Sequence, residues 1–425
     1  MASFQKNFLK KVIPPPIYKF FRPAYHYLMP FFGAIANGFP SRGLYVIGIT
    51  GTKGKSSTTE ILNAILERAG YKTALSNTIR FKIGDHSERN LHKMSMPGRF
   101  FMQNFLARAK KAGCTHAIVE MTSEGAKQFR HKWIDLDAFV FTNISPEHIE
   151  SHGSYEKYRA AKLSIGKLIE TSKKTDKIVV VNGDDPEAFR FLGLNAENKI
   201  PYSLRDAEPY AVGENSAEHG TFFTFRGAEI RPKLIGLFNI YNALAAATTA
   251  RALGIPDTTI KEAIENMPGI LGRVEKVDVG QDFDVIVDYA HTADSLEKLY
   301  QAFPNQRKIC VLGNTGGGRD VWKRPEMAKI ADKYCARIVL TNEDPYDEAP
   351  QKIVNEMKTA ITEKPCEIIM DRRQAIAKAI SYARLGNVVL ISGKGTDPYI
   401  MGPKGSKTPW SDVDVAREEL EKAGR

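Results

Sequence analysis

The chain has 425 residues, with 60 Lys and Arg against 49 Asp and Glu and a formal net charge of +11. With 43% hydrophobic and 26% charged residues it has the composition of a folded globular protein, which excludes a disordered chain, a collagen-like chain and a disulfide scaffold. This length accommodates a few domains, because domains commonly hold about 100–200 residues.

The net charge and the cysteines exclude fewer classes of protein than the overall composition does. The positive excess suits a polyanionic ligand such as a nucleotide, and would equally suit nucleic acid or an anionic membrane surface. The four cysteines contain no C-x-x-C pair, so we expect no zinc ribbon and reduced thiols of the kind found in a cytosol. They are Cys114, Cys310, Cys335 and Cys366.

Residues 1–43 form a short aromatic and basic N-terminal segment. It is not a secretory signal, because Pro14–Pro16 interrupts the apolar run that would follow the early lysines. Pro23 and Pro30 are expected to break any long amphipathic helix here. Two functions stay open for the segment. It could be a helical strap or dimer contact, or an interfacial membrane anchor in which basic residues flank aromatic ones.

Beyond residue 44, short β-branched runs alternate with longer amphipathic ones. This alternation predicts a doubly wound α/β sheet with parallel strands, in a central domain that spans residues 44–268. We expect a small antiparallel insertion at residues 199–232 and a helix at 239–253. The strands expected in the central domain lie at residues 45–49, 117–119, 138–141 and 178–181.

A Pro/Gly cluster at residues 267–272 suits a hinge, and the alternation restarts after it. The sequence therefore predicts a second α/β domain, of Rossmann-like type, over residues 269–425. Its expected strands lie at residues 285–287, 309–312, 338–340 and 388–391.

A glycine-rich stretch, G-I-T-G-T-K-G-K-S-S at residues 48–57, follows the first strand and opens a helix. Its backbone N–H groups and the positive end of the helix can hold phosphate oxygens. Lys55 is expected to reach the β- and γ-phosphates, and the Ser56 hydroxyl to bind Mg²⁺. The strict G-x-x-x-x-G-K-[ST] pattern fails because its first glycine would fall on Ile49, so a plain strand-to-helix turn is the alternative. The residues expected to bind ATP here are Gly51, Thr52, Lys53, Gly54, Lys55, Ser56 and Ser57.

This G-T-x-G-K-[ST] variant resembles that of the Mur ligase family, the ATP-dependent ligases that add amino acids to the peptidoglycan precursor. The resemblance extends over nearly all of residues 44–425 and is strongest to the MurE branch, which adds the third residue of the stem peptide. It implies an ATP- and Mg²⁺-dependent cytoplasmic enzyme, which we expect to be a monomer. Members of this branch begin with a domain that binds the UDP group of the precursor. The resemblance implies that this domain is truncated to residues 1–43 here.

Three residues are expected by this resemblance to act with Mg²⁺. Glu120 ends a strand at the carboxyl edge of the sheet, where ligands bind in open α/β folds. His148 closes the segment T-N-I-S-P-E-H, in which Glu147 replaces the Asp usual in the family. Lys162 ends Y-R-A-A-K and matches a lysine that CO₂ carbamylates into a carboxylate-like ligand, although taken alone it would be a solvated helix lysine. The expected catalytic residues are Lys55, His148 and Lys162.

Motifs further along the chain match the family's remaining ATP contacts. By this match, Asn239 of F-N-I-Y-N is expected to contact the adenine, and Arg273 of G-R-V-E is expected to contact the nucleotide. Asp288 of D-Y-A-H-T is expected to complete the site from the C-terminal domain. Taken alone, Asn239 could instead cap a helix and Asp288 could form a turn.

The resemblance also implies two segments that grip the muramoyl-peptide acceptor. Ser95 and Met96 stand where two Thr are usual in the family, and Met96 cannot donate a hydrogen bond. The residues expected to bind the acceptor are Ser95, Thr122, Gln128 and Arg130.

The C-terminal domain is expected to bind the incoming amino acid. Arg319 matches a family Arg that binds its α-carboxylate. Tyr346 stands where diaminopimelate-adding members have an Arg, while Asp344 and Asp397 would suit an ammonium. These differences favour lysine or ornithine over diaminopimelate. The residues expected to bind the amino acid are Arg319, Asp344, Tyr346, Gly393 and Asp397.

The predicted function is ATP-dependent ligation through an acyl phosphate formed on the muramoyl-peptide carboxylate, which the amino group of the amino acid then attacks. Its partners would be ATP, the muramoyl-peptide and the amino acid. A peripheral contact of residues 1–43 with the inner membrane face stays open. The alternatives are a ligase of the same fold for a lipid-linked precursor or for folate polyglutamylation, and a nucleotide-binding module without catalysis. No recognition motif supports a nucleic-acid partner, and none is expected.

Overall fold

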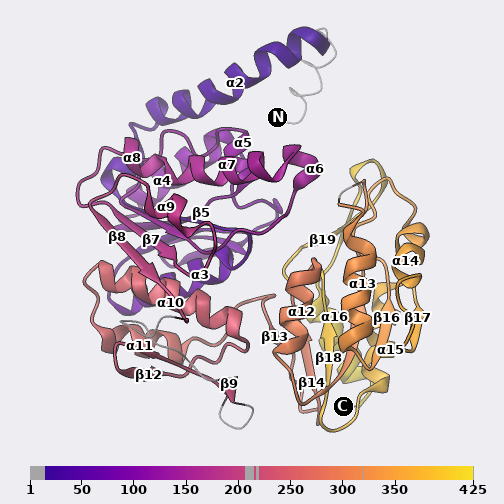
Figure 1. The fold of residues 1–425 in the computed structure, drawn as a ribbon. Coiled ribbons are helices and arrows are strands. Elements are labelled where there is room, and N and C mark those ends of the chain that lie inside the picture. The colour runs from indigo at the N-terminus through magenta and orange to yellow at the C-terminus, as the bar shows by residue number, and fades with distance from the viewer. Residues whose placement is uncertain (1–14, 206–214, 217–219, 319, 425) are drawn as a thin grey trace.

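The computed structural model describes residues 15–205, 215–216, 220–318 and 320–424. They form two α/β units, each built on its own large sheet (Figure 1). The expected class is confirmed: a central unit with a phosphate-binding type of loop is followed by a Rossmann-like C-terminal unit.

The first unit is built on an eight-stranded sheet in the order β4-β3-β2-β5-β1-β6-β7-β8. Every pair is parallel except β2–β3 and β3–β4 at one edge. The strands are β1 (Tyr45–Thr50), β2 (Thr73–Ser76), β3 (Arg80–Ile83), β4 (His86–Arg89), β5 (His116–Glu120), β6 (Ala138–Phe141), β7 (Ile178–Asn182) and β8 (Asn198–Tyr202).

Strand β1 lies between β5 and β6, and this arrangement positions the site. Ile49 is in register with Glu120, and Thr50 is in register with Phe141. The three strands therefore release their following loops at the same edge of the sheet, which is where open α/β sheets bind ligands.

Helices cover both faces of this sheet because the strands carry apolar side chains on both sides. Helices α3 and α10 pack together on one face, and α4 and α7 belong to the core of the other face. The helices of this unit are α3 (Lys55–Arg68), α4 (Arg99–Lys111), α5 (Ser123–Lys127), α6 (Ile149–His152), α7 (Tyr155–Gly166), α8 (Leu168–Thr171), α9 (Ala188–Leu192), α10 (Leu237–Ala252) and α11 (Asp257–Asn266).

The expected antiparallel insertion is smaller than predicted. Residues 198–202 form β8, which pairs in parallel with β7 and belongs to the main sheet. Antiparallel pairing occurs within two pairs of short strands, β9 with β10 and β11 with β12. The rest of the segment lies partly outside the described residues. These strands are β9 (Asn215–Ser216), β10 (Gly220–Thr221), β11 (Phe223–Phe225) and β12 (Ala228–Ile230).

The second unit is a six-stranded sheet in the order β13-β14-β18-β15-β16-β17, parallel except for the β13–β14 pair. A small hairpin of β19 and β20 adjoins it. The strands are β13 (Glu275–Lys276), β14 (Asp284–Val287), β15 (Arg307–Leu312), β16 (Arg337–Leu340), β17 (Cys366–Ile368), β18 (Asn387–Ile391), β19 (Tyr399–Met401) and β20 (Lys407–Pro409). The helices are α12 (Ala293–Gln301), α13 (Lys323–Tyr334), α14 (Pro350–Lys358), α15 (Arg372–Tyr382) and α16 (Asp412–Lys422).

The expectation of reduced thiols is wrong for two of the four cysteines. Cys310 on β15 and Cys335 at the end of α13 are joined by a disulfide, with their Cα atoms 6.2 Å apart. A search for C-x-x-C pairs detects only neighbours in sequence, whereas the β15–α13 connection brings these buried thiols together across 25 residues. Cys114 and Cys366 are free.

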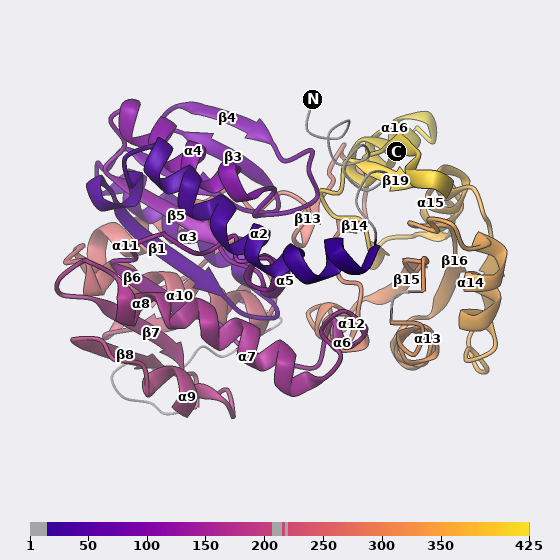
Figure 2. The same cartoon turned by 90° about the horizontal axis from the view of Figure 1, so that it is seen from above.

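The N-terminal segment contains a continuous helix, α2 (Pro15–Ala36), which contradicts the expectation that its prolines would break it. Figure 2 shows this helix lying over the first unit, where it packs on α4. The Phe31 ring lies 4.6 Å from the Trp133 ring, so tertiary packing compensates for what the prolines cost the helix. In the described part of the chain, no helix is both long enough and apolar enough to cross a membrane.

Candidate active site

The loop between β1 and α3 has the backbone of a phosphate cradle. Gly54 adopts a φ of 81°, and a Cβ at this position would lie 2.1 Å from the side-chain oxygen of Asn242. Only glycine fits this conformation and spacing. Gly54 immediately precedes α3, whose first backbone N–H groups point out of the N-terminal end of the helix. Lys55 folds back over the loop, and its Nζ donates to the carbonyl oxygens of Gly51 and Thr52, each 2.9 Å away.

A cluster of oxygen atoms adjoins this loop. The Ser56 hydroxyl donates to Oε2 of Glu120 at 2.8 Å. The backbone N–H and the hydroxyl of Thr78 donate to the two oxygens of the same carboxylate, each at 3.0 Å. Hydroxyl and carboxylate oxygens are the ligands that Mg²⁺ prefers, so the donor set fits a magnesium ion. Sequence reasoning missed Thr78, which no motif marks.

Lys162 is buried rather than solvated, and it contacts the loop. Its Nζ donates to the carbonyl oxygen of Gly51 at 2.6 Å, and its side chain is only 2% exposed. Burial, together with the nearby charge of Lys55, lowers the pKa of Lys162 well below its usual value. Burial therefore shifts the equilibrium of this group from the ammonium toward the uncharged amine.

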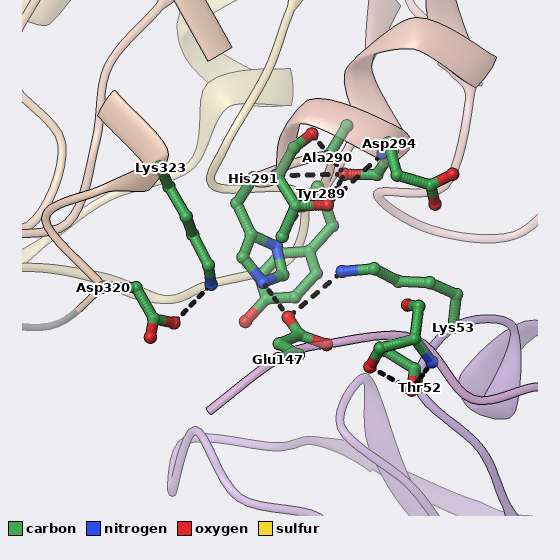
Figure 3. A network of polar contacts seen from close by, with 12 residues as sticks. Thr52, Lys53, Glu147, Tyr289, Ala290, His291, Asp294, Asp320 and Lys323 are labelled. Carbon is green, nitrogen blue, oxygen red and sulfur yellow. Dashed lines mark hydrogen bonds and ion pairs between the residues drawn. The ribbon is translucent and has the colours of Figure 1, made fainter. Parts of the chain in front are cut away.

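Glu147 joins the two units. Its Oε1 accepts a hydrogen bond from Lys53 Nζ at 3.1 Å and lies 3.2 Å from Nε2 of His291, which belongs to the C-terminal unit (Figure 3). Burial alone would raise the pKa of Glu147, but the charge of Lys53 and the hydrogen bond of His291 outweigh it and hold this pKa well below its usual range. The ionised carboxylate therefore connects the phosphate loop to the second unit.

His148 follows in a left-handed conformation, with a φ of 56°. Burial lowers its pKa to about 4, so its ring is neutral near pH 7 and keeps a lone pair for a ligand. Within the described residues, no three His, Cys, Asp or Glu side chains are grouped closely enough to hold a metal by themselves.

A cavity of about 770 Å³ brings together many of the residues singled out by the sequence. Both units contribute to its wall. Those singled out are Thr52, Lys55, Ser95, Thr122, Gln128, Arg130, His148, Lys162, Asp344, Tyr346 and Asp397. Sequence reasoning did not assign a role to three further lining residues: Lys93, His291 and Lys323. Arg319 lies outside the described residues.

Three expected nucleotide contacts do not line this cavity. Asn239 donates to the carbonyl oxygen of Ile235 at 2.9 Å. The guanidinium of Arg273 lies 4.4 Å from the centre of the Tyr289 ring. Asp288 accepts hydrogen bonds from the backbone N–H groups of Val274 and Ala290, at 2.8 and 2.7 Å. All three side chains therefore make contacts within the protein, in addition to the nucleotide contacts that the sequence suggests for them.

The expected acceptor-binding residues share one wall of the cavity. The Thr122 hydroxyl accepts from the backbone N–H of Gly125 and so caps α5. Arg130 donates to Oε1 of Gln128 at 2.7 Å and also to the carbonyl oxygen of Met96. The Ser95 hydroxyl is buried and has no hydrogen-bond partner among the described residues. An uncommitted hydroxyl at this wall suits a polar ligand group.

On the wall that the second unit contributes, Asp344 and Asp397, which the sequence suggests for an ammonium, are already paired with lysines. Lys93 Nζ lies 2.7 Å from Oδ2 of each aspartate. The buried Lys394 donates to Oδ1 of Asp344, also at 2.7 Å. Burial alone would raise the pKa of Asp344, but Lys394 and Lys93 outweigh it and lower that pKa. Tyr346 stands beside them, and its backbone N–H donates to Met401.

Gly393 has no side chain to contact a ligand, but it lets the backbone pass close to the carboxylate of Glu343. Its φ is 104°, and a Cβ there would lie 2.2 Å from Oε2 of Glu343. Asp320 and Lys323 form an ion pair on the C-terminal side of the cavity (Figure 3). No motif of the sequence analysis had marked this pair.

Two family models match the chain. The Mur ligase middle domain matches residues 49–250, and the Mur ligase glutamate ligase domain matches residues 272–395. Among curated relatives, the UDP-N-acetylmuramoyl-L-alanyl-D-glutamate–2,6-diaminopimelate ligase of Syntrophomonas wolfei is 37% identical over 394 residues, which cover 90% of this chain and 79% of that relative. A UDP-N-acetylmuramyl-tripeptide synthetase of a Roseiflexus species is 34% identical over 411 residues, 91% of this chain and 80% of that relative.

Solved structures agree with these matches. A UDP-N-acetylmuramoyl-L-alanyl-D-glutamate–2,6-diaminopimelate ligase aligns with a TM-score of 0.61 and 27% identity, over 90% of this chain and 79% of that one. A folylpolyglutamate synthase of Mycobacterium tuberculosis aligns with a TM-score of 0.70 over 94% of this chain and 95% of that one. At 15% identity, the second alignment shows a shared fold alone.

Proposed function

Because this chain belongs to the Mur ligase family, we propose that it joins the amino group of an amino acid to the terminal carboxylate of a muramoyl-peptide at the expense of ATP. The observation that carries the proposal is the single cavity that Lys55 and Lys162, the acceptor wall of Thr122 and Arg130, and the second unit line together. The names of the relatives support the acceptor, since both act on UDP-N-acetylmuramoyl compounds.

The phosphate loop would hold ATP. The close packing at Gly54 leaves no room for a side chain in the cradle, and Ser56 and Glu120 offer oxygen ligands beside it. When bound, Mg²⁺ supplies positive charge to the phosphates and ATP supplies the phosphoryl group. Lys55 would leave the carbonyl oxygens of its own loop and neutralise the phosphoryl oxygens as the acceptor carboxylate attacks.

An oxygen of the acceptor carboxylate attacks the γ-phosphorus and displaces ADP, which gives an acyl phosphate. The amino group then attacks the acyl carbon, and phosphate leaves with that carboxylate oxygen. The contact of His291 with Glu147 would keep the second unit closed over the cavity, so that the amine rather than water reaches the acyl phosphate.

Lys162 would act as a carbamate. Its uncharged, buried amine is the form that attacks CO₂: a C–N bond forms and the nitrogen releases a proton to solvent. A carbamate here would add two oxygens near Gly51 and the Ser56–Glu120 cluster, and these groups would then hold a second Mg²⁺. The lowered pKa of Lys162, caused mainly by burial, supports this step.

The two units would serve as two domains, with residues 44–268 carrying ATP and the acceptor and residues 269–425 carrying the amino acid. The hinge would lie between the end of α11 at Asn266 and the start of β13 at Glu275. Arg273 and Asp288 adjoin this connection, which suits residues that respond to nucleotide.

Helix α2 would add a peripheral contact with a membrane surface. Its outward face is apolar at helical spacing, and its other face packs on α4, as a strap would. The exposed residues are Tyr25, Leu28, Phe32 and Ile35. Co-sedimentation of the full chain with anionic vesicles tests this, since the Phe32→Ser variant should then release the protein. If the unaltered chain did not bind vesicles, the membrane contact would be excluded, and α2 would serve only as a strap packed on α4.

The function is tested by ATP-dependent phosphate release across a matrix of acceptors and amino acids. The proposal expects release only when a muramoyl-peptide and an amino acid are both present. Release with a folate or lipid-linked acceptor in place of the muramoyl-peptide would assign the same chemistry to another acceptor. Absence of release with every pair would remove the ligase function.

A further inference from the structure

Lys93 reaches from the first unit into the amino-acid wall of the second. It lies in the loop between β4 and α4, and its Nζ is 2.7 Å from both Asp344 Oδ2 and Asp397 Oδ2. A second contact lies close by, because Arg89 at the end of β4 donates to the carbonyl oxygen of Thr396 at 3.0 Å. The lysine is therefore placed by contacts between the units.

The loop that carries Lys93 is also fixed from its own side. The Asn90 side chain donates to the carbonyl oxygens of Asn77 and Met94, at 2.7 and 3.0 Å, and accepts from the backbone N–H of His92. Two residues beyond Lys93 comes Ser95, on the acceptor wall. One loop thus contributes to the walls of both substrates.

The charges on this wall balance. Asp344 and Asp397 carry two negative charges, and Lys93 and Lys394 carry two positive ones. Lys394 is fully buried, donates to the carbonyl oxygen of Tyr399 at 2.6 Å, and does not line the cavity. Lys93 lines the cavity, so it is the cation of this set that a ligand can meet.

We propose that Lys93 determines which amino acid the enzyme uses: its ammonium binds a carboxylate at the far end of the incoming side chain, while Asp397 and Asp344 bind an ammonium beside that carboxylate. This rests on the proposed ligase function and adds to it the residue that selects the substrate, an amino acid whose side chain ends in a zwitterion. A lysine ammonium has three donors, of which the two aspartates take two, so a third remains for a carboxylate.

A side chain that ends in ammonium alone fits this wall less well. It would add a third positive charge to two aspartates that Lys93 and Lys394 already neutralise, and it would bring no carboxylate to the remaining donor of Lys93. A zwitterionic end adds no net charge and keeps both contacts between the units. Lys93, a cation from the other unit, would therefore reverse the preference for lysine or ornithine expected from the sequence.

The experiment compares meso-diaminopimelate with L-lysine as the amino acid, at a fixed muramoyl-peptide acceptor, by the kcat/KM of phosphate release. Lys93→Met should lower kcat/KM for diaminopimelate about tenfold or more, since a charge-assisted contact is lost. The same variant should leave the value for lysine unchanged or raise it, because the aspartates are then less neutralised. Lys93→Arg should restore much of the preference.

Lys407→Met is the matched control. Lys407 also lines the cavity, but it is exposed, lies over the Tyr399 ring and forms no ion pair with either aspartate among the described contacts. Its loss removes the same charge and should leave the ratio of the two kcat/KM values unchanged. A thermal unfolding midpoint and a KM for ATP close to those of the wild type would show that Lys93→Met folds and binds nucleotide.

Two results would overturn the proposal. One is an unchanged ratio of the two kcat/KM values in Lys93→Met, whether both values fall equally, as for a contact that only holds the units together, or neither changes. The other is a wild-type preference for lysine. Failure of the ligase function itself would look different, because the wild type would then release no phosphate with either amino acid.

Discussion

The Nζ atom of Lys162 lies 2.6 Å from the carbonyl oxygen of Gly51, so a lysine of helix α7 touches the phosphate loop directly. The contact is buried, and the lysine also lies 4.8 Å from the centre of the Tyr158 ring. Burial disfavours the charged ammonium, and it outweighs the Tyr158 ring and the carboxylates of Glu147 and Glu120, which favour that form. The solvated helix position that the sequence alone suggested for Lys162 is therefore wrong.

Replacing Lys162 by alanine should abolish ligation while the protein still folds. The loss of a buried side chain is expected to cost about 2–4 kcal/mol of folding free energy. Phosphate release should fall by about a hundredfold or more, because the carbamate oxygens are missing. Short carboxylic acids should partly restore it by entering the space left beside Gly51.

The control for Lys162→Ala is Lys157→Ala, an exposed lysine on the same helix. It should keep both the activity and the unfolding midpoint. In the unaltered protein, ¹³CO₂ should give a carbamate signal that Lys162→Ala lacks. A Lys162→Ala protein as active as the wild type would contradict the carbamate.

Breaking the contact between the units should uncouple ATP consumption from ligation. His291→Ala removes the partner 3.2 Å from Glu147 and leaves that carboxylate to Lys53 alone. Water should then reach the acyl phosphate more often, so that more phosphate is released per amide formed. We expect kcat for amide formation to fall by about tenfold or more.

The ratio of phosphate to amide product measures this uncoupling. An exposed histidine, His86 on β4, provides the control, and His86→Ala should keep the ratio of the wild type. If His291→Ala slowed the reaction without changing the ratio, the contact would not protect the intermediate.

Stability should decline in mild acid because of a buried histidine. His131 is 1% exposed, and neither of its ring nitrogens has a hydrogen-bond partner among the described residues. Burial lowers its pKa to about 3, so the unfolded chain binds a proton that the folded one does not as the pH falls below about 6.5. Between pH 6.5 and pH 5 this should cost about 2 kcal/mol.

Urea unfolding at pH 7 and pH 5 checks this expectation. His131→Gln should make the free energy of unfolding less dependent on pH over this range, because the titrating group is gone. His86→Gln should retain the dependence of the wild type. A pH dependence that is the same in His131→Gln as in the wild type would contradict the account.

Sequence patterns revealed those parts of the site that are local in the chain. The phosphate loop is one contiguous stretch between a strand and a helix, and Glu120 follows from its place at the end of β5. The parallel sheet then brings them together, because β1 and β5 are neighbours.

Contacts between distant segments could not be read from the sequence. Lys93 meets Asp344 across 251 residues, and no spacing rule marks a loop lysine as the partner of an aspartate in another unit. The disulfide of Cys310 and Cys335 depends in the same way on a strand–helix connection. Proline rules alone gave the wrong result for α2, since they do not include the packing of the helix on α4.

Isotope transfer from the acceptor carboxylate to phosphate shows whether an acyl phosphate forms on that carboxylate. A muramoyl-peptide with ¹⁸O in its terminal carboxylate is ligated to the amino acid, and the released phosphate is analysed by mass spectrometry. We expect one ¹⁸O atom in each phosphate released, because the attacking carboxylate oxygen leaves with the phosphorus. Phosphate without ¹⁸O, formed together with the amide product, would exclude the acyl phosphate.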